Sequence, residues 1–120
     1  MYKFITYSLM MLFIFTVQAQ INLPAGSSAA SVTTTVGLTE VSISYFRPKM
    51  KGRKIFGIDG SALLEYGVMW RTGANSGTTV TLSTPAKIGG TEVPAGTYLI
   101  ITTPGDDQFD FMLYGDPSIG

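Results

Sequence analysis

Short runs in which apolar and polar side chains alternate dominate the chain after residue 30. Residues 31–36 and 41–46 are rich in β-branched side chains and alternate with a period of two, which is typical of half-buried strands. Because only a short polar segment separates these runs, they predict an antiparallel hairpin. In the second run Val41, Ile43 and Tyr45 would share one face, and we expect that face to be buried.

The same alternation predicts further short strands toward the C-terminus. They fall at residues 68–72, 78–82, 86–88, 91–93, 97–103 and 108–114. The paired glycines Gly89 and Gly90 suit the positive φ angles of a two-residue hairpin turn. Short strands at this spacing indicate an all-β fold, an antiparallel β-sandwich or partly open barrel. Only a turn follows the last strand, so we expect that strand at a sheet edge and a domain, residues 31–120, that is incomplete at its C-terminus.

Regular alternation fails over a long connection, residues 47–67, which contains one proline and four glycines. Within it, residues 61–65 could form one helical turn with Ser61 as its N-cap. The connection also contains apolar side chains that should be driven onto the body of the domain rather than left in solvent. These are Ile55, Phe56, Ile58, Leu63 and Leu64.

The N-terminus has the pattern of an export signal. Lys3 precedes an apolar run, residues 4–17, and Val17-Gln18-Ala19 has the small-residue spacing of a cleavage site. An uncleaved membrane anchor would need roughly 20 apolar residues, more than this run provides. We therefore expect a signal peptide at 1–19, a flexible lead-in at 20–30, and a periplasmic or extracellular protein with no membrane span after cleavage.

Composition removes several function classes. The chain has no cysteine and no histidine, so thiolate chemistry, disulfides and every Ser-His-Asp arrangement are excluded. Eight basic and eight acidic residues give a formal net charge of zero, and no overall field would attract nucleic acid. We predict no cofactor and no metal site.

Candidate binding residues gather around the long connection. Five of the eight basic residues lie between residues 47 and 54, where they either form a solvated loop or hold an anion. Aromatic rings beside cations could also stack on sugars. The candidate ligand-binding residues are Tyr45, Arg47, Lys51, Arg53, Arg71 and Asn75. The corresponding partner would be a carbohydrate or an anionic small molecule.

Arg71 belongs to the segment M-W-R-T-G-A-N, residues 69–75, which reads as a strand ending in a turn. In an extended segment Trp70 faces away from Arg71, so the indole can enter the core while the guanidinium points outward. Arg71 could be an internal clamp on Glu65 or Glu40, or it could contact a ligand. The sequence leaves both interpretations open.

Acidic residues offer a weaker hypothesis, a hydrolase with two carboxylates. The pool comprises Asp106, Asp107, Asp110, Glu65 and Glu92. Aspartate is favoured in turns for backbone reasons, so we name no catalytic residue. A further alternative is a structural module that pairs with another chain by strand addition.

Three segments carry a resemblance to a known family: R-P-K-M-K-G-R-K-I-F-G at 47–57, Y-G-V-M-W-R-T-G-A-N at 66–75 and P-A-G-T-Y at 94–98. Together with the signal peptide, they resemble an exported bacterial family, familiar from Bacteroidetes, called domain of unknown function 2911. The resemblance implies a β-sandwich-like domain with further strands in its relatives, and it implies no activity. The leading hypothesis is therefore an exported, non-catalytic binding module.

Overall fold

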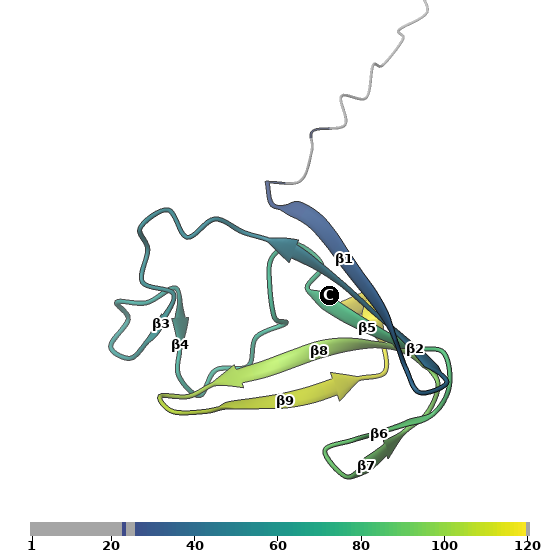
Figure 1. The fold of residues 1–120 in the computed structure, drawn as a ribbon. Coiled ribbons are helices and arrows are strands. Elements are labelled where there is room, and N and C mark those ends of the chain that lie inside the picture. Colours follow the sequence, from purple (N-terminus) through teal and green to yellow (C-terminus); the bar gives the residue numbers. More distant parts are fainter. Residues whose placement is uncertain (1–22, 24–25, 120) are drawn as a thin grey trace, which may run out of the picture.

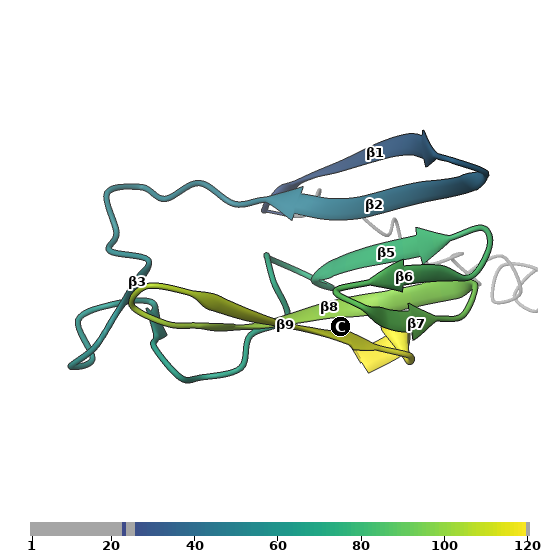
Figure 2. The same ribbon diagram turned by 60° about the horizontal axis from the view of Figure 1, so that its bottom comes forward.

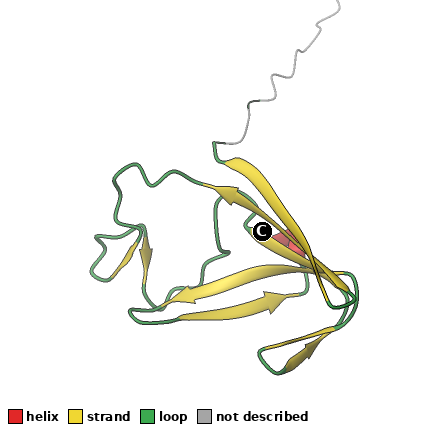
Figure 3. Ribbon diagram, viewed as in Figure 1, coloured by secondary structure: helices red, strands yellow, loops and turns green. Residues whose placement is uncertain are grey.

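The computed structural model describes Leu23 and residues 26–119. Strands and loops make up this part of the chain, apart from one 3-10 turn, η1, at Pro117–Ile119 (Figure 3). The expected signal peptide lies outside the described residues, as do residues 20–22, 24 and 25 of the expected lead-in, whose last residues, 28–30, belong to the first strand. Among the helices of the described part, none has the length and apolar character needed to cross a membrane.

Five strands form one antiparallel sheet in the order β1-β2-β5-β8-β9 (Figure 1). Their bounds are β1 Ser28–Val36, β2 Thr39–Arg47, β5 Thr78–Leu82, β8 Gly96–Pro104 and β9 Phe109–Tyr114. Within the described residues the sheet is open, because β1 and β9 form its two edges. This confirms the all-β, antiparallel fold class and the edge position of the last strand, and it excludes a closed barrel.

Two small strand pairs lie beside the sheet, as Figures 1 and 2 show. The predicted hairpin consists of β6, Ala86–Ile88, and β7, Thr91–Val93. Gly89 and Gly90 join these strands with φ angles of 56° and 86°, as expected. The long connection contributes β3, Phe56–Gly57, and β4, Leu64–Glu65, which pair in parallel.

Alternation along the strands gives the sheet two different faces. Cross-strand partners share a face, so the register creates an apolar row, Val32–Ile43–Val80–Tyr98, beside a polar row, Thr33–Ser42–Thr81–Thr97. Hydroxyls in the polar row bond to one another: Thr33 donates to Ser42 at 3.0 Å, and Thr81 and Thr97 are 2.9 Å apart. We call the side of the apolar row the Val80 face and the other side the Leu99 face.

The core lies at β5, the central strand of the sheet, and at its neighbour β8. Three hydrophobic side chains of the described residues are buried: Val80 and Leu82 on β5, and Leu99 on β8. Burying such a side chain contributes about 1.5–3 kcal/mol, so each is a large share of a small core. As expected, Val41, Ile43 and Tyr45 lie on the same face as Val80, although they are only half-buried.

The first hairpin is confirmed, with longer strands than predicted. β1 begins at Ser28 rather than Ser31, and the turn comprises only Gly37 and Leu38 because Val36 pairs with Thr39. Gly37 has a φ of 63°, a conformation that glycine adopts without strain. The extra pairs extend the hairpin past both predicted ends.

Two local predictions are wrong. Residues 61–65 form no helical turn, because the amides of Leu63 and Leu64 donate to the carbonyls of Lys54 and Ile55 across the connection. Residues 68–72 form no continuous strand: Trp70 alone makes a bridge, with Thr102. Thr72 has a φ of 50°, which turns the chain away from β8.

Candidate functional site

The corner at residues 70–77 is fixed to the sheet by hydrogen bonds. The Trp70 amide donates to the Thr102 carbonyl at 2.7 Å, and the Thr102 amide donates back at 2.8 Å. The Thr78 hydroxyl donates to the Thr72 carbonyl, and the Thr72 and Thr102 hydroxyls are 3.0 Å apart. These bonds join the corner to β8 through Thr102 and to β5 through Thr78.

Aromatic contacts join the long connection to the sheet. Phe56 on β3 packs edge-on against Trp70, with ring centroids 5.8 Å apart, and against Phe109 on β9, at 5.2 Å. Such pairs contribute about 0.5–1.5 kcal/mol each beyond the area they bury. The Trp70 indole also donates to the Gly73 carbonyl at 3.1 Å. The prediction that apolar residues of the connection pack onto the body is confirmed for Phe56. It is wrong for Ile58 and Leu63, which are 65% and 56% exposed.

A groove lies between the connection and this corner, and we call it the loop groove. Its volume is about 440 Å³, within the range of small-molecule sites. Most of its lining is apolar, and Lys49 and Arg53 supply two cations. The apolar lining residues are Pro48, Met50, Ile55, Leu63, Leu64, Trp70 and Ala74.

Arg53 is held in place by its own loop. Its Nε donates to the Met50 carbonyl at 3.0 Å, and one terminal nitrogen donates to the Lys49 carbonyl at 2.9 Å. A guanidinium has five N–H groups, so these bonds leave others to meet an anion. Holding the side chain in advance reduces the entropy lost when it binds.

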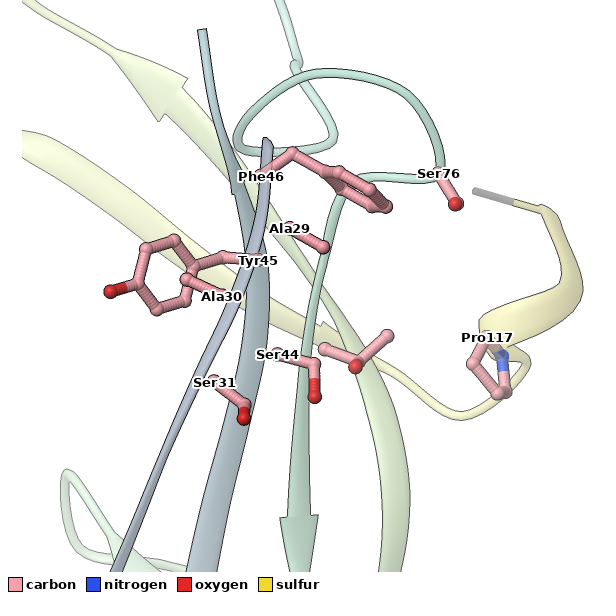
Figure 4. Close-up of a pocket in the computed structure, with 10 residues that line it drawn as sticks. Ala29, Ala30, Ser31, Ser44, Tyr45, Phe46, Ser76 and Pro117 are labelled. Atoms are coloured by element: carbon pink, nitrogen blue, oxygen red, sulfur yellow. The ribbon is translucent and has the colours of Figure 1, made fainter. Parts of the chain in front are cut away.

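A second depression, the strand hollow, lies on the Leu99 face and has a volume of about 480 Å³. Figure 4 shows the Phe46 ring directed toward Ser76, whereas the Tyr45 ring points to the other side of β2. Alternation along the strand explains the difference. The hollow therefore offers the ring of Phe46 rather than that of Tyr45, and its lining contains no charged side chain.

Of the six predicted binding residues, Arg53 lines the loop groove, and Tyr45 borders the strand hollow with its ring pointing to the other side of β2. Arg47 ends β2, and Lys51 occupies a turn with a φ of 52°; both are exposed and line neither depression. Arg71 is exposed too, which does not fit a clamp buried against a carboxylate. Arg53 therefore lines the loop groove, whereas Arg71 is not among its lining residues.

Asn75 supports the mouth of the loop groove indirectly. Its side-chain amide donates to the Ser27 carbonyl at 3.4 Å, and Ser27 is a lining residue. Asn75 has a φ of 52°, a conformation that asparagine tolerates better than most residues. Its position in the turn explains its presence without a ligand.

The acidic residues lie on different elements. Glu65 is on β4, Glu92 on β7 opposite Lys87, and Asp110 on β9, while Asp106 and Asp107 are exposed between β8 and β9. In the described part of the chain, no cluster of acidic residues could hold a metal ion. Among the described residues, these five carboxylates are therefore divided among three strands and one exposed turn.

Two other aspartates, Asp59 and Asp116, have lowered pKa values because of neighbouring hydrogen-bond donors. Hydrogen bonds from Ser61 lower the pKa of the Asp59 carboxyl, with a smaller contribution from the Lys54 charge. The Ser118 hydroxyl and amide donate to Asp116 at 2.6 and 2.9 Å and lower its pKa. Both carboxyls are fully exposed in turns, so these shifts reflect turn structure.

Sequence reasoning missed most of the loop groove. Lys49, Met50 and Ser27 were not among the predicted binding residues, and Trp70 was assigned to the core. The sequence did contain a usable signal, because the apolar residues of the connection were expected to pack onto the body of the domain. The cations that alternate with those residues could then have been placed at the edge of that packed surface.

Comparison of the chain with known proteins gives one match. The family model described as "Protein of unknown function (DUF2911)" matches residues 27–118. No curated protein and no solved structure matches the chain.

Proposed function

The chain belongs to the DUF2911 family of proteins of unknown function, and we propose that it is a non-catalytic binding module for an anionic ligand. The observation that carries the proposal is the loop groove, where an anchored Arg53 and Lys49 border an apolar lining. Following the export signal predicted at residues 1–19, the ligand would come from the cell envelope or its surroundings.

The lining favours a ligand that has an apolar part. Met50, Leu63 and Trp70 can take an alkyl or aromatic group out of water, and each buried methylene contributes about 0.8 kcal/mol. Arg53 would bind the carboxylate or phosphate head through charge-assisted hydrogen bonds. Such a ligand is an anionic amphiphile.

A carbohydrate is the alternative within this class. Sugar recognition needs several polar side chains around an aromatic ring, and the groove offers only Ser27, Lys49 and Arg53 beside Trp70. The lining therefore favours an anionic amphiphile over a carbohydrate as the ligand.

Calorimetric titration with decyl phosphate, decanoate, decanol and a uronic-acid oligosaccharide tests the proposal. We expect binding of the two anionic amphiphiles and weaker binding of decanol. Arg53→Ala should weaken binding about 10-fold or more, because a hydrogen bond to a charged group contributes about 1.5–3 kcal/mol. Lys87→Ala, which removes an exposed cation on the β6–β7 hairpin, is the matched control and should bind as the unaltered protein does.

Equal losses in the two variants would point to nonspecific charge attraction and contradict the proposal. Binding of the oligosaccharide alone would replace the amphiphile by a carbohydrate. Absence of heat with every probe would remove the support for this groove.

A second candidate function is assembly by strand addition. The specific observation in its favour is that β9 forms an edge of the main sheet. A hydrolytic function gains no support from the scattered carboxylates described above.

A further inference from the structure

Residues 50–53 form a tight turn, and its two ends, Met50 and Arg53, line the loop groove. The Arg53 amide donates to the Met50 carbonyl at 3.1 Å. The two residues between them, Lys51 and Gly52, have φ angles of 52° and 73°. Positive φ angles at both central positions are those of a type I′ turn. Glycine adopts this conformation freely, whereas a lysine in it is uncommon and strained, and such residues cluster at ligand sites.

The side chain of Arg53 fastens this turn. Its Nε donates to the Met50 carbonyl at 3.0 Å, and its Nη2 donates to the Lys49 carbonyl at 2.9 Å. The Met50 carbonyl therefore accepts hydrogen bonds from both the backbone and the side chain of Arg53. Because the turn fixes the two carbonyls, a change in its shape moves the guanidinium.

These two bonds occupy one edge of the planar guanidinium. Nε and one N–H of Nη2 lie along the side of the group, whereas Nη1 and the other N–H of Nη2 lie along its end. The carbonyls of Lys49 and Met50 take the side edge. An anion in the groove would therefore meet the end edge, where two parallel N–H groups match the two oxygens of a carboxylate or phosphate.

We propose that Gly52 is a positioning residue for this groove: through the type I′ turn it holds Arg53 so that the end edge binds an anion with two oxygens. The inference rests on the proposed function and deepens it by assigning the class of head group. A single cation at residue 53 would attract any negative charge, whereas a fixed fork selects carboxylates and phosphates by geometry.

Calorimetric titration with decyl phosphate and decanol tests the role of Gly52. Gly52→Ala places a Cβ in a left-handed conformation that disfavours it, so the turn and Arg53 should shift. We expect decyl phosphate to bind about 10-fold or more weakly, because a hydrogen bond to a charged group is lost. Binding of decanol, which has no anionic head, should stay unchanged.

Gly90→Ala is the matched control for Gly52→Ala. Gly90 is the second residue of the β6–β7 turn and has a φ of 86°. At both glycines, no heavy atom of a non-neighbouring described residue lies within 4 Å of the Cβ position. The two variants therefore carry similar backbone strain, and Gly90→Ala should bind decyl phosphate as the unaltered protein does.

Arg53→Lys separates the fork from its charge. Lysine keeps the positive charge, but a single ammonium cannot both bond to two carbonyls of the turn and present two parallel N–H groups. We expect Arg53→Lys to weaken decyl phosphate binding about 10-fold or more, close to the loss in Arg53→Ala. Full affinity in Arg53→Lys would overturn the proposal.

NMR exchange of the arginine Nε–H protons tests the positioning without a ligand. The Nε–H of Arg53 should exchange with water more slowly than that of Arg47, because it is hydrogen-bonded to the Met50 carbonyl. Gly52→Ala should speed this exchange and Gly90→Ala should not. Equal exchange in Gly52→Ala and the unaltered protein would overturn the proposal.

The binding data distinguish this inference from the function on which it rests. Decyl phosphate binding that persists undiminished in Gly52→Ala would overturn the inference and leave the proposed function standing. An unaltered protein that protects the Arg53 Nε–H but binds no decyl phosphate would overturn the proposed function, and the inference with it.

Discussion

Replacing Gly77 by alanine probes how the corner at residues 70–77 packs on the sheet. Gly77 is buried and has a φ of 84°. A Cβ built there would lie 2.6 Å from the Arg71 carbonyl oxygen and 3.1 Å from a methyl group of Leu99. The first contact is with backbone and cannot be relieved by rotating a side chain.

Two costs therefore add in Gly77→Ala. An L-residue in the left-handed region costs about 1–2 kcal/mol, and forcing extra volume into a packed site costs about 1–3 kcal/mol more. Gly37→Ala is the matched control, because Gly37 has a φ of 63° and no atom within 4 Å of its Cβ position. It should show only the backbone cost.

Urea unfolding followed by tryptophan emission measures both variants. We expect Gly77→Ala to lower the free energy of unfolding by about 2–5 kcal/mol, a large share of the stability of a small domain. Equal losses in the two variants would refute the reasoning, because they would show that a Cβ at residue 77 is not opposed by the Arg71 carbonyl or by Leu99.

Three further predictions follow from other contacts. Phe56→Ala should lower the free energy of unfolding by about 1–3 kcal/mol through lost aromatic pairs and shift tryptophan emission to the red, as measured by urea unfolding and fluorescence. Thr102→Val should cost about 1 kcal/mol, because it removes a buried hydroxyl bonded to Thr72, whereas Thr81→Val at an exposed site should cost less in the same assay. Ser118→Ala should raise the pKa of Asp116 toward its ordinary value, as followed by NMR titration, because the folded pKa is lowered mainly by the Ser118 hydroxyl. In the unaltered protein, Asp116 contributes to stability above the ordinary carboxyl pKa, and this contribution is lost as pH falls through the lowered pKa of the folded state.

Strand alternation predicted most of the main sheet. Residues 78–82 match β5 at both ends, and the paired glycines at 89 and 90 sit in the predicted turn. These elements depend on local side-chain periodicity and on turn conformation, which are written directly in the sequence.

Non-local hydrogen bonds explain the failures. Residues 61–65 have helical character locally, but the amides of Leu63 and Leu64 find carbonyl partners at Lys54 and Ile55. No periodicity within the segment indicates such partners. Likewise, the hydroxyl of Thr78 bonds to the carbonyl of Thr72, which stabilises a turn where alternation alone predicted a strand.

The candidate site was predictable only in part for the same reason. Arg53 was identified by its place in a cluster of basic residues. The sequence could not show that it shares a groove with Met50 and Trp70 rather than with Arg71. That choice depends on how the connection folds over the corner, which the contact of Phe56 with Trp70 and Phe109 determines.

The most direct test of the binding proposal is a fluorescence titration with decyl phosphate. Trp70 is the only tryptophan and lines the loop groove, so its emission reports occupancy of that groove. We predict a saturable blue shift that Arg53→Ala displaces to higher ligand concentration. Calorimetric binding of the same ligand with no change in Trp70 emission would place the site elsewhere and contradict the account.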